Sequence, residues 1–277
     1  MIRMGRLKGF AMSFSQLGSL ATAWVAALGL WVALLIATPI SLWMGGDSLF
    51  PLMATLGVLA QAMATLLALA DIWPLGRIIK AIAIILIGAW LVEWLGATTG
   101  FPFGDYAYTD VLQPQLAQVP LLIPVAWLMM LAPAWAVAEA ILVSRRGRLG
   151  GQYALLHALL TGLVFTTWDL YLDPQMVARG LWVWDNSVGG DYFGIPWLNF
   201  LGWWLSAVLL TLIVRPTLVL RSRLMIIYTL TWAFQAVGLG LFWGQPGPAL
   251  VGLVGMGGFV AWAWSKELKA WTSSSGP

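Results

Sequence analysis

Residues 224–265 read LMIIYTLTWAFQAVGLGLFWGQPGPALVGLVGMGGFVAWAWS and carry no charged side chain between Arg223 and Lys266. A helix crosses a bilayer with about 20 apolar residues, so this stretch is long enough for two crossings. The glycines and prolines at 244–248, Gly-Gln-Pro-Gly-Pro, are typical of a turn and divide the stretch in two. The sequence therefore predicts two membrane-spanning helices joined by a tight turn.

The rest of the chain has the same character. Of its 277 residues, 61% are hydrophobic and only 9% are charged. Soluble domains have about 45–50% apolar and about 25% charged residues. This composition excludes a soluble globular domain, a disordered chain and a fibrous protein. The chain also has no cysteine and a single histidine, which excludes disulfides, thiolate metal centres and multi-histidine metal sites.

The apolar runs predict an all-α, polytopic membrane helical bundle that forms a single transmembrane domain over residues 1–277. About eight transmembrane helices are expected, near residues 20–43, 50–70, 77–97, 120–143, 151–172, 198–214, 224–243 and 248–265. With eight crossings, all of the 14 lysines and arginines except Arg179 fall on one side. The positive-inside rule makes that side, with both termini, cytoplasmic. Topology thus explains the net charge of +3, and no nucleic-acid partner is expected.

Two connections on the opposite, outer side are much longer than the others, at residues 98–119 and 173–197. Both are rich in aromatic side chains and contain glycine and proline turns. Long loops of this kind are usually functional, and so many aromatic residues argue against disorder. We expect the two loops to pack together as a cap over the outer mouth of the bundle, where most of the acidic residues also lie.

Glu93 is an acidic residue inside an apolar helix, in the string ILIGAWLVEWLGA (85–97). A carboxyl group at this depth is costly and is expected to face the bundle interior or a cavity. Shielding from water favours the neutral form of a carboxyl group, so Glu93 is a candidate catalytic acid. The alternative is a structural role, in which Glu93 forms a hydrogen bond to a neighbouring helix.

The fifth predicted helix ends in TTWDLYLDP (166–174), where Asp169 and Asp173 share a face and lie one turn apart. Two carboxylates at that spacing repel each other, so one of them holds its proton more tightly. Such a pair suits one acid and one base in a single catalytic site. Alternatively, Asp173 and Pro174 end the helix in a turn, and Asp169 makes an interhelical hydrogen bond.

The first long loop supplies three further candidates. Asp110 is a candidate catalytic carboxylate, and its alternative is a hydrated loop charge or a turn-forming residue. Tyr106 and Tyr108 alternate with small residues and can direct a hydroxyl inward. Their alternative is a place in a belt of aromatic residues at the membrane interface.

Six of the 19 tryptophans lie close in sequence to the outer acids: Trp168, Trp182, Trp184, Trp197, Trp203 and Trp204. An acid beside several indole rings can protonate an alkene, and the ring faces then stabilise the carbocation. The alternative for each of these tryptophans is structural packing. Residues 252–258, rich in glycine, indicate close helix packing rather than nucleotide binding.

Four strings resemble a known family, the membrane carotenoid hydratases, which include gamma-carotene 1'-hydroxylases and bisanhydrobacterioruberin hydratases. They are TGFPFGDYAYTD (99–110), VPLLIPVAWLMMLAPAW (119–135), TWDLYLDPQMVARGLWVWD (167–185) and YFGIPWLNFLGW (192–203). The resemblance covers about residues 90–204. It implies an enzyme that adds water to the terminal isoprenoid double bond of an acyclic carotenoid end, as in lycopene or gamma-carotene. It also implies that no oxygen, flavin, metal or other cofactor is needed.

Together, the residues and the resemblance suggest roles for individual side chains. We expect the catalytic carboxyls among Glu93, Asp169, Asp173 and Asp110, with Glu93 or Asp169 as proton donor and Asp173 or Asp110 orienting the water. The expected substrate-binding residues are Tyr106, Tyr108, Trp168, Trp182, Trp184, Tyr192, Trp197, Asn199 and Trp203. The expected partners are a lipid-dissolved carotenoid, membrane lipids and other enzymes of carotenoid biosynthesis. The expected location is the plasma membrane or an internal photosynthetic membrane, as a multi-pass protein.

Other functions remain open at this point. A carotenoid end-group cyclase would form a similar cation and lose a proton instead of gaining water. A proton-coupled transporter would carry its charged groups near the bilayer midplane, often in repeated halves, whereas these acids cluster at one mouth and no repeat is visible. A pigment-binding protein without catalysis is a further alternative.

Overall fold

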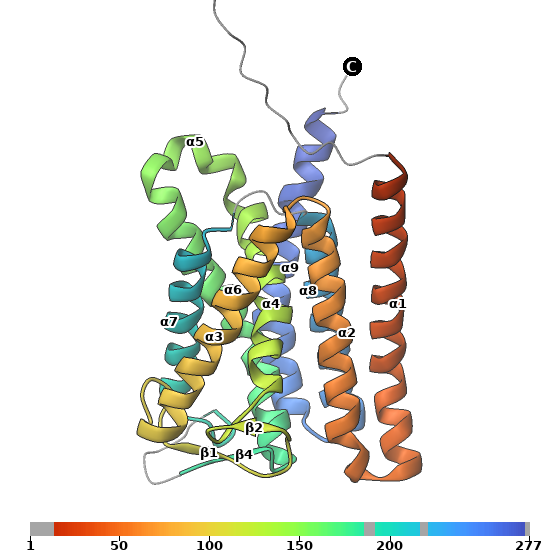
Figure 1. The fold of residues 1–277 in the computed structure, drawn as a ribbon, viewed down its shortest axis with the longest axis vertical. Coiled ribbons are helices and arrows are strands. Elements are labelled where there is room, and N and C mark those ends of the chain that lie inside the picture. The colour runs from red at the N-terminus through yellow and green to blue at the C-terminus, as the bar shows by residue number, and fades with distance from the viewer. Residues whose placement is uncertain (1–13, 186–191, 217–220, 275–277) are drawn as a thin grey trace, which may run out of the picture.

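The structure is a computed structural model that describes residues 14–185, 192–216 and 221–274. In this part of the chain, seven segments are long and apolar enough to cross a membrane. One of them, Leu122–Ala178, has 57 residues and would be about 85 Å long as a straight helix at 1.5 Å per residue. It turns back at residues 143–152 instead, so the described chain forms eight long helices (Figure 1). The predicted all-α polytopic bundle is confirmed.

The long helices are α1 (Phe14–Gly45), α2 (Phe50–Ala70), α3 (Leu75–Thr99), α4 (Leu122–Leu142), α6 (Tyr153–Ala178), α7 (Trp197–Val214), α8 (Arg221–Val237) and α9 (Pro246–Ser274). The short helical elements are η1 (Asp47–Leu49), η2 (Val143–Arg145), α5 (Arg146–Leu149), η3 (Gly150–Gln152) and the π-helical η5 (Gly238–Phe242). Four short strands follow: β1 (Tyr106–Tyr108), β2 (Gln115–Leu116), β3 (Val119–Pro120) and β4 (Trp182–Trp184). Each predicted helix corresponds to one observed helix, with α8 and η5 together filling one predicted range.

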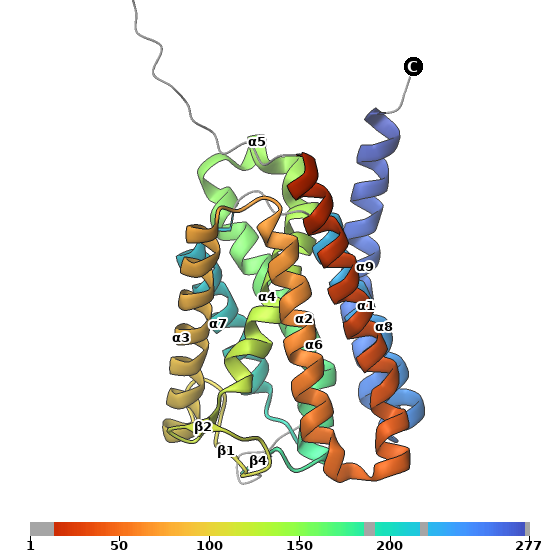
Figure 2. The same cartoon turned by 45° about the vertical axis from the view of Figure 1, so that its right-hand side comes forward.

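Helix α4 lies at the centre of the bundle and packs against α2, α3, α6, α8 and α9. Because other helices surround it, nearly all of its side chains are buried. Helix α1 lies at the edge, where it packs mainly against α2, and Figure 2 shows it on the outside of the bundle. The arrangement therefore leaves α1 as a peripheral helix and α4 as the core.

The two ends of the bundle differ in composition. The start of α1, the end of α9 and α5 lie at one end, and the strands lie at the other (Figure 1). The first end carries the arginines of α5 and three ion pairs: Arg146 with Glu139 at 3.6 Å, Arg221 with Glu267 at 2.7 Å, and Arg223 with Asp71. The strand end carries a pair between Arg179 and Asp47 at 3.1 Å. This matches the two sides predicted from the charges.

The prediction that Asp173 and Pro174 could end their helix is wrong, because α6 continues through Pro174 to Ala178. A proline inside a helix has no N–H for the carbonyl four residues earlier. That carbonyl, of Leu170, accepts a hydrogen bond from the Tyr192 hydroxyl instead, at 2.8 Å. The loop thus supplies the donor that Pro174 lacks, and Asp173 stays on the helix one turn from Asp169.

In the central helix, too, a side chain from another helix replaces a hydrogen bond that a proline cannot make. Pro133 lies inside α4 and leaves the carbonyl of Met129 without its helical donor. The hydroxyl of Thr65, on α2, donates to the Met129 carbonyl at 3.1 Å. Both residues lie in the buried interior, so this bond replaces one that water could not supply there.

Glycines of α9 allow close helix packing, as the sequence indicated. A Cβ atom at Gly255 would lie 2.8 Å from Cδ1 of Leu170 on α6. A Cβ atom at Gly257 would lie 2.8 Å from the indole nitrogen of Trp232 on α8. Both positions are therefore small because a neighbouring helix occupies the space of a side chain.

The bond between Thr65 and Met129 gives a stability prediction. We expect Thr65→Val to lower the free energy of unfolding by about 1–3 kcal/mol, because the buried Met129 carbonyl loses its donor. Thr55→Val is the matched control, since the Thr55 hydroxyl donates only within its own helix, to the carbonyl of Pro51 at 2.7 Å. The measurement is thermal unfolding of the purified protein in detergent. Equal effects of the two substitutions would contradict this role of Thr65.

Candidate active site

The two long loops at the strand end of the bundle meet in a small antiparallel sheet. Strand β1 pairs with β4 so that Tyr106 lies opposite Trp184 and Tyr108 lies opposite Trp182. Alternate residues of a strand face opposite sides, so these four aromatic side chains share one face. Ala107 and Val183 share the other face and are exposed. The predicted cap is therefore a two-stranded ribbon that turns four aromatic rings toward the helices.

Glu93 on α3 receives hydrogen bonds from this cap. The hydroxyls of Tyr106 and Tyr108 each donate to its Oε2 atom at 2.7 Å. The indole N–H of Trp127, on α4, donates to Oε1 at 3.0 Å. The Glu93 side chain is thus buried, and three donors from two directions hold its carboxyl group in place.

The phenol groups of the cap are protected donors. Burial, followed by the nearby Glu93 carboxyl, raises the pKa of Tyr108 well above its ordinary value. The same two causes, in the same order, raise the pKa of Tyr106. Both hydroxyls therefore keep their protons through the alkaline range and continue to donate to Glu93.

A second carboxyl cluster lies on α6. Asn199, near the start of α7, donates through its side-chain nitrogen to Oδ2 of Asp169 at 2.8 Å and also to Oδ2 of Asp173. One amide NH₂ group has two hydrogens and can serve both acceptors. The indole N–H of Trp182 donates to Oδ1 of Asp173 at 2.9 Å. Asp169, Asp173 and Asn199 are 0%, 2% and 2% exposed, so the cluster is shielded from solvent.

No cation balances these acids in the part of the chain that is described. The four ion pairs found there join arginines to Asp47, Asp71, Glu139 and Glu267, and the single histidine, His157, lies 3.9 Å from Glu139. Oδ1 of Asp169 is buried and has no hydrogen-bond partner. Two carboxylates that share one amide donor repel each other strongly in a medium of low dielectric. A proton shared within the Asp169–Asp173 pair removes this repulsion and gives the free oxygen a hydrogen to carry.

The two acidic groups face one small cavity, here called the chamber. Its volume is about 20 Å³, and about 10–15 Å³ is enough for one water molecule. Glu93 and Asp173 both line the chamber, together with Tyr106, Tyr108, Phe103, Ile123, Ala126, Trp127, Leu172, Trp182, Trp184, Asn199 and Trp203. The chamber therefore has room for one water molecule between two carboxyl groups.

Stacked rings form the wall of the chamber on the helix side. The centroid of the Trp127 ring lies 4.9 Å from that of Trp203, and Phe165, which does not line the chamber itself, lies 4.9 Å from Trp127. On the cap side, Tyr106 lies 5.0 Å from Trp184. Aromatic ring faces carry negative charge density and attract a cation placed over them.

Glycines position the loop at the chamber. A Cβ atom at Gly96 on α3 would lie 2.6 Å from the Phe103 ring and 2.9 Å from the Tyr106 hydroxyl. A Cβ atom at Gly202 on α7 would lie 2.6 Å from the opposite edge of the Phe103 ring. The Phe103 ring is thus held between two helices at positions that only glycine leaves open, and it anchors the start of the cap.

The structure brings most of the predicted site residues together. Those at the chamber are Glu93, Asp173, Tyr106, Tyr108, Trp182, Trp184, Asn199 and Trp203. Asp169 lies directly behind Asp173, joined to it through Asn199. The sequence predicted that Tyr106 and Tyr108 can direct a hydroxyl inward. In the structure both hydroxyls point inward and donate to Glu93.

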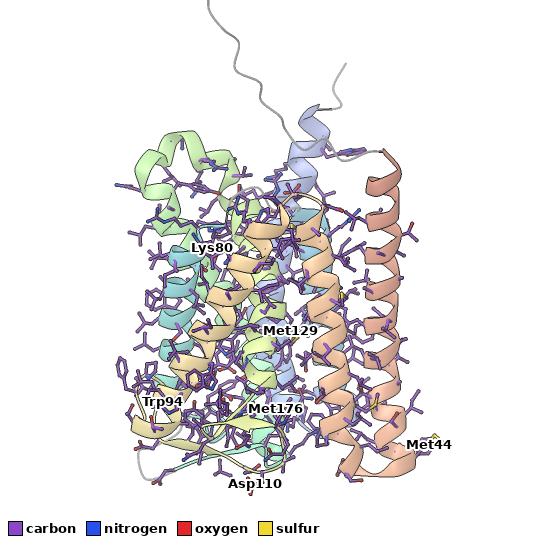
Figure 3. All side chains as sticks on the ribbon, in the orientation of Figure 1. Met44, Lys80, Trp94, Asp110, Met129 and Met176 are labelled. Atoms are coloured by element: carbon purple, nitrogen blue, oxygen red, sulfur yellow. The ribbon has the colours of Figure 1, made fainter. Side chains whose placement is uncertain are left out.

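Besides Asp169, four predicted residues lie outside the chamber. Asp110 is exposed at the strand end of the molecule (Figure 3). Trp197 is 58% exposed and packs against Tyr192, whose hydroxyl is bonded to the α6 backbone. Trp168 is buried and contacts Trp203 edge to face at 5.9 Å, but it lines a different cavity. Of these, Asp110 is not positioned to orient the chamber water.

Sequence reasoning missed Trp127, the third donor to Glu93. Trp127 lies within the apolar string 119–135, where nothing in the sequence distinguishes it from a tryptophan that only packs in the helix. Phe103 and Leu172 were missed for the same reason, because an apolar wall has no distinctive residue type.

For the described residues, no group of three or more histidine, aspartate or glutamate side chains is arranged to hold a metal ion.

Two comparisons with known proteins found matches to this chain. The family described as carotenoid biosynthesis protein matches residues 50–259. A bisanhydrobacterioruberin hydratase of Haloarcula japonica is 33% identical over 116 residues, which is 42% of this chain and 37% of that protein. The chain thus matches little more than a third of the length of this curated relative. No solved structure matches the chain.

The family match runs from the first residue of α2 to residue 259 within α9 and includes every residue of the chamber. By the extent of this match, the protein belongs to the carotenoid biosynthesis protein family.

Proposed function

We propose that this protein is a carotenoid hydratase, which adds water to the terminal isoprenoid double bond of an acyclic carotenoid end. One observation carries the proposal: two buried carboxyl groups, Glu93 and Asp173, face a chamber that has aromatic walls and the volume of about one water molecule. Acid-catalysed hydration needs a proton donor, a water molecule, a base and a surface that stabilises a cation. The chamber offers each of these within one small space, and the hydratase from Haloarcula japonica is a relative.

The Asp169–Asp173 pair is suited to be the acid. The pair shares one proton, for the electrostatic reason given above. The free oxygen of Asp169 stores that proton, and Asp173, the member that lines the chamber, passes it to the substrate. Transfer of that proton to the less substituted alkene carbon leaves a tertiary carbocation and an ionised aspartate pair. The negative charge formed on the pair then attracts the cation, which lowers the barrier to its formation.

Glu93 is suited to be the base. Hydrogen bonds from two hydroxyls and one indole all point toward its carboxyl oxygens, which is the pattern of an acceptor. As the water oxygen bonds to the cation, Glu93 accepts one proton from it, and the product is a tertiary alcohol. The proton on Glu93 returns to the aspartate pair through the next chamber water, so the cycle closes without an oxidant or a reductant.

The aromatic walls have two tasks in this scheme. The rings of Trp127, Trp203 and Trp184 stabilise the positive charge, by about 2 kcal/mol or more for each well-placed ring away from water. They also exclude further water, which keeps the acid protonated until the substrate arrives. A cyclase would share the first step but would return a proton from the cation instead of adding water, and the water-sized chamber favours hydration.

We further propose that the chain crosses the membrane several times, with the end that holds α5 in the cytoplasm. The support is the collection of basic residues at that end and the positive-inside rule. The chamber then lies toward the outer face of the membrane. A carotenoid dissolved in the bilayer would reach it from the side.

The first test is expression in a lycopene-accumulating host with mass analysis of the pigments. We expect a product heavier than lycopene by one water for each end that reacts. Asp173→Asn and Glu93→Gln are each expected to lower the rate of product formation by about a hundredfold or more, the usual effect of losing a general acid or base. Protein levels in the membrane serve as the control. A product of unchanged mass would indicate a cyclase, and full activity of both variants would refute the assigned roles.

The second test concerns the donors to Glu93. Tyr106→Phe and Tyr108→Phe each remove one bond to the carboxyl, and bonds to charged groups contribute about 1.5–3 kcal/mol. We therefore expect each substitution to slow hydration about tenfold, and the double variant to slow it further. Tyr228→Phe is the matched control, because that hydroxyl bonds to Val164 and Thr167 away from the chamber. Wild-type rates in both cap variants would show that the hydroxyls do not serve the reaction.

A further inference from the structure

A second and much larger cavity, here called the groove, lies between α1, α2, α6 and α8. Its volume is about 620 Å³, within the range of about 300–1,000 Å³ typical of small-molecule sites. Its wall is mostly apolar and includes Trp31, Leu35, Met53 and Val58. The chamber has room for about one water molecule, so a long ligand needs a space such as the groove.

The groove is elongated along the bundle axis. On α1 its wall runs from Trp31 to Trp43, which spans about 18 Å at 1.5 Å per residue. Met129 and Met176 also line it, and Figure 3 shows Met129 halfway along the bundle and Met176 close to the strands. The groove therefore runs from mid-depth to the strand end, which suits a long and narrow molecule.

The mouth of the groove faces the surrounding lipid. Its lining includes Ile36, Ile40, Val237 and Phe242, which are 51%, 50%, 46% and 58% exposed. These residues belong to peripheral α1 and to the end of α8 with the π-helical η5, a type of distortion that is frequent at functional sites. An opening edged by apolar side chains admits a lipid-dissolved molecule without passage through water.

The groove and the chamber meet at one side chain. Among the described residues, Leu172 alone lines both cavities. It lies on α6 one residue before Asp173, and Trp168, one turn earlier, joins the groove wall to the chamber ring of Trp203. A molecule in the groove thus has its shortest route to the acids past Leu172.

A buried polar group marks the same place. Gln175 lines the groove one turn beyond Leu172 and is 3% exposed, yet its side-chain oxygen has no hydrogen-bond partner. Buried acceptors are nearly always paired in folded proteins. The amide oxygen therefore points to an occupant that brings a donor, and a water molecule on its way to the chamber supplies one.

We propose that the groove binds the long hydrocarbon chain of the substrate and that Leu172 is the residue past which its reactive end enters the chamber. This inference rests on the proposed function, since it takes the ligand to be the molecule that reacts there. It assigns binding and reaction to separate cavities: the groove selects a long apolar chain, and the chamber acts on one end of it.

Two glycines provide a matched test. A Cβ atom at Gly57, on the groove wall, and one at Gly29, on the exposed side of α1, would each meet no atom within 4 Å. Gly57→Phe should fill part of the groove without a clash, and Gly29→Phe should add the same ring facing lipid. The probe is lycopene, and its binding to detergent-purified protein is followed through quenching of tryptophan fluorescence.

We expect Gly57→Phe to weaken lycopene binding about tenfold or more, because the new ring occupies space in the groove that several carbon groups of the bound lycopene chain would fill. Gly29→Phe should bind like the wild type. Asp173→Asn should also bind lycopene normally while losing hydration, so binding in the groove is measured independently of the reaction. If Gly57→Phe binds lycopene as tightly as Gly29→Phe, the groove is not the site of the chain.

Leu172→Trp tests the passage. A larger side chain at this position should block entry to the chamber, so lycopene still binds but hydration falls at least tenfold. Normal hydration by a well-folded Leu172→Trp variant would overturn the assigned route. A further outcome separates the two proposals. If neither the wild type nor any variant hydrates lycopene, but Gly57→Phe still binds it more weakly than Gly29→Phe, the proposed reaction is rejected and the groove assignment stands.

Discussion

The strand end of this bundle depends on the hydrogen bonds that hold the carboxyl group of Glu93. A lone acid in an apolar helix is costly, and two phenols and an indole buried without an acceptor would be costly as well. The bonds from Tyr106, Tyr108 and Trp127 remove both costs together. They also tie the cap to α3 and α4. Because β1 is paired with β4, the same bonds bring Trp182 onto Asp173.

This shared cap explains how one small chamber can hold two acids in different surroundings. Glu93 is surrounded by donors, whereas Asp169 has a free oxygen and shares the amide of Asn199 with Asp173. Two carboxyls in different surroundings suit one acid and one base. The groove adds a third element, since it can hold an apolar chain beside the chamber without admitting bulk water.

Much of the fold could be predicted from the sequence, because helices in a bilayer must satisfy their own backbone. The long apolar runs predicted each helix, and the arginines predicted which helix ends lie together. The continuation of α6 through Pro174 was not predictable, because the donor that replaces the proline N–H comes from Tyr192, 22 residues from Leu170. A pattern within one helix contains no information about such a donor.

The candidate site was predictable where its residues are chemically unusual for a membrane helix or loop. Glu93, Asp169 and Asp173 stood out as acids, and the alternation of Tyr106 and Tyr108 indicated a shared face. Trp127 and Leu172 did not stand out, because an apolar side chain gains its role only from what packs beside it. Asp110 failed to reach the chamber for a related reason: acidity marks a candidate residue, but the turn of the loop decides which way it faces.

The central claim is that the chamber adds one water molecule to an alkene by protonation followed by capture of the cation. Isotope labelling of the product tests it most directly, in reactions run in H₂¹⁸O and in D₂O. The account predicts ¹⁸O in the new hydroxyl group and one non-exchangeable deuterium on the adjacent carbon. A hydroxyl oxygen derived from O₂, or a product without carbon-bound deuterium, would contradict it.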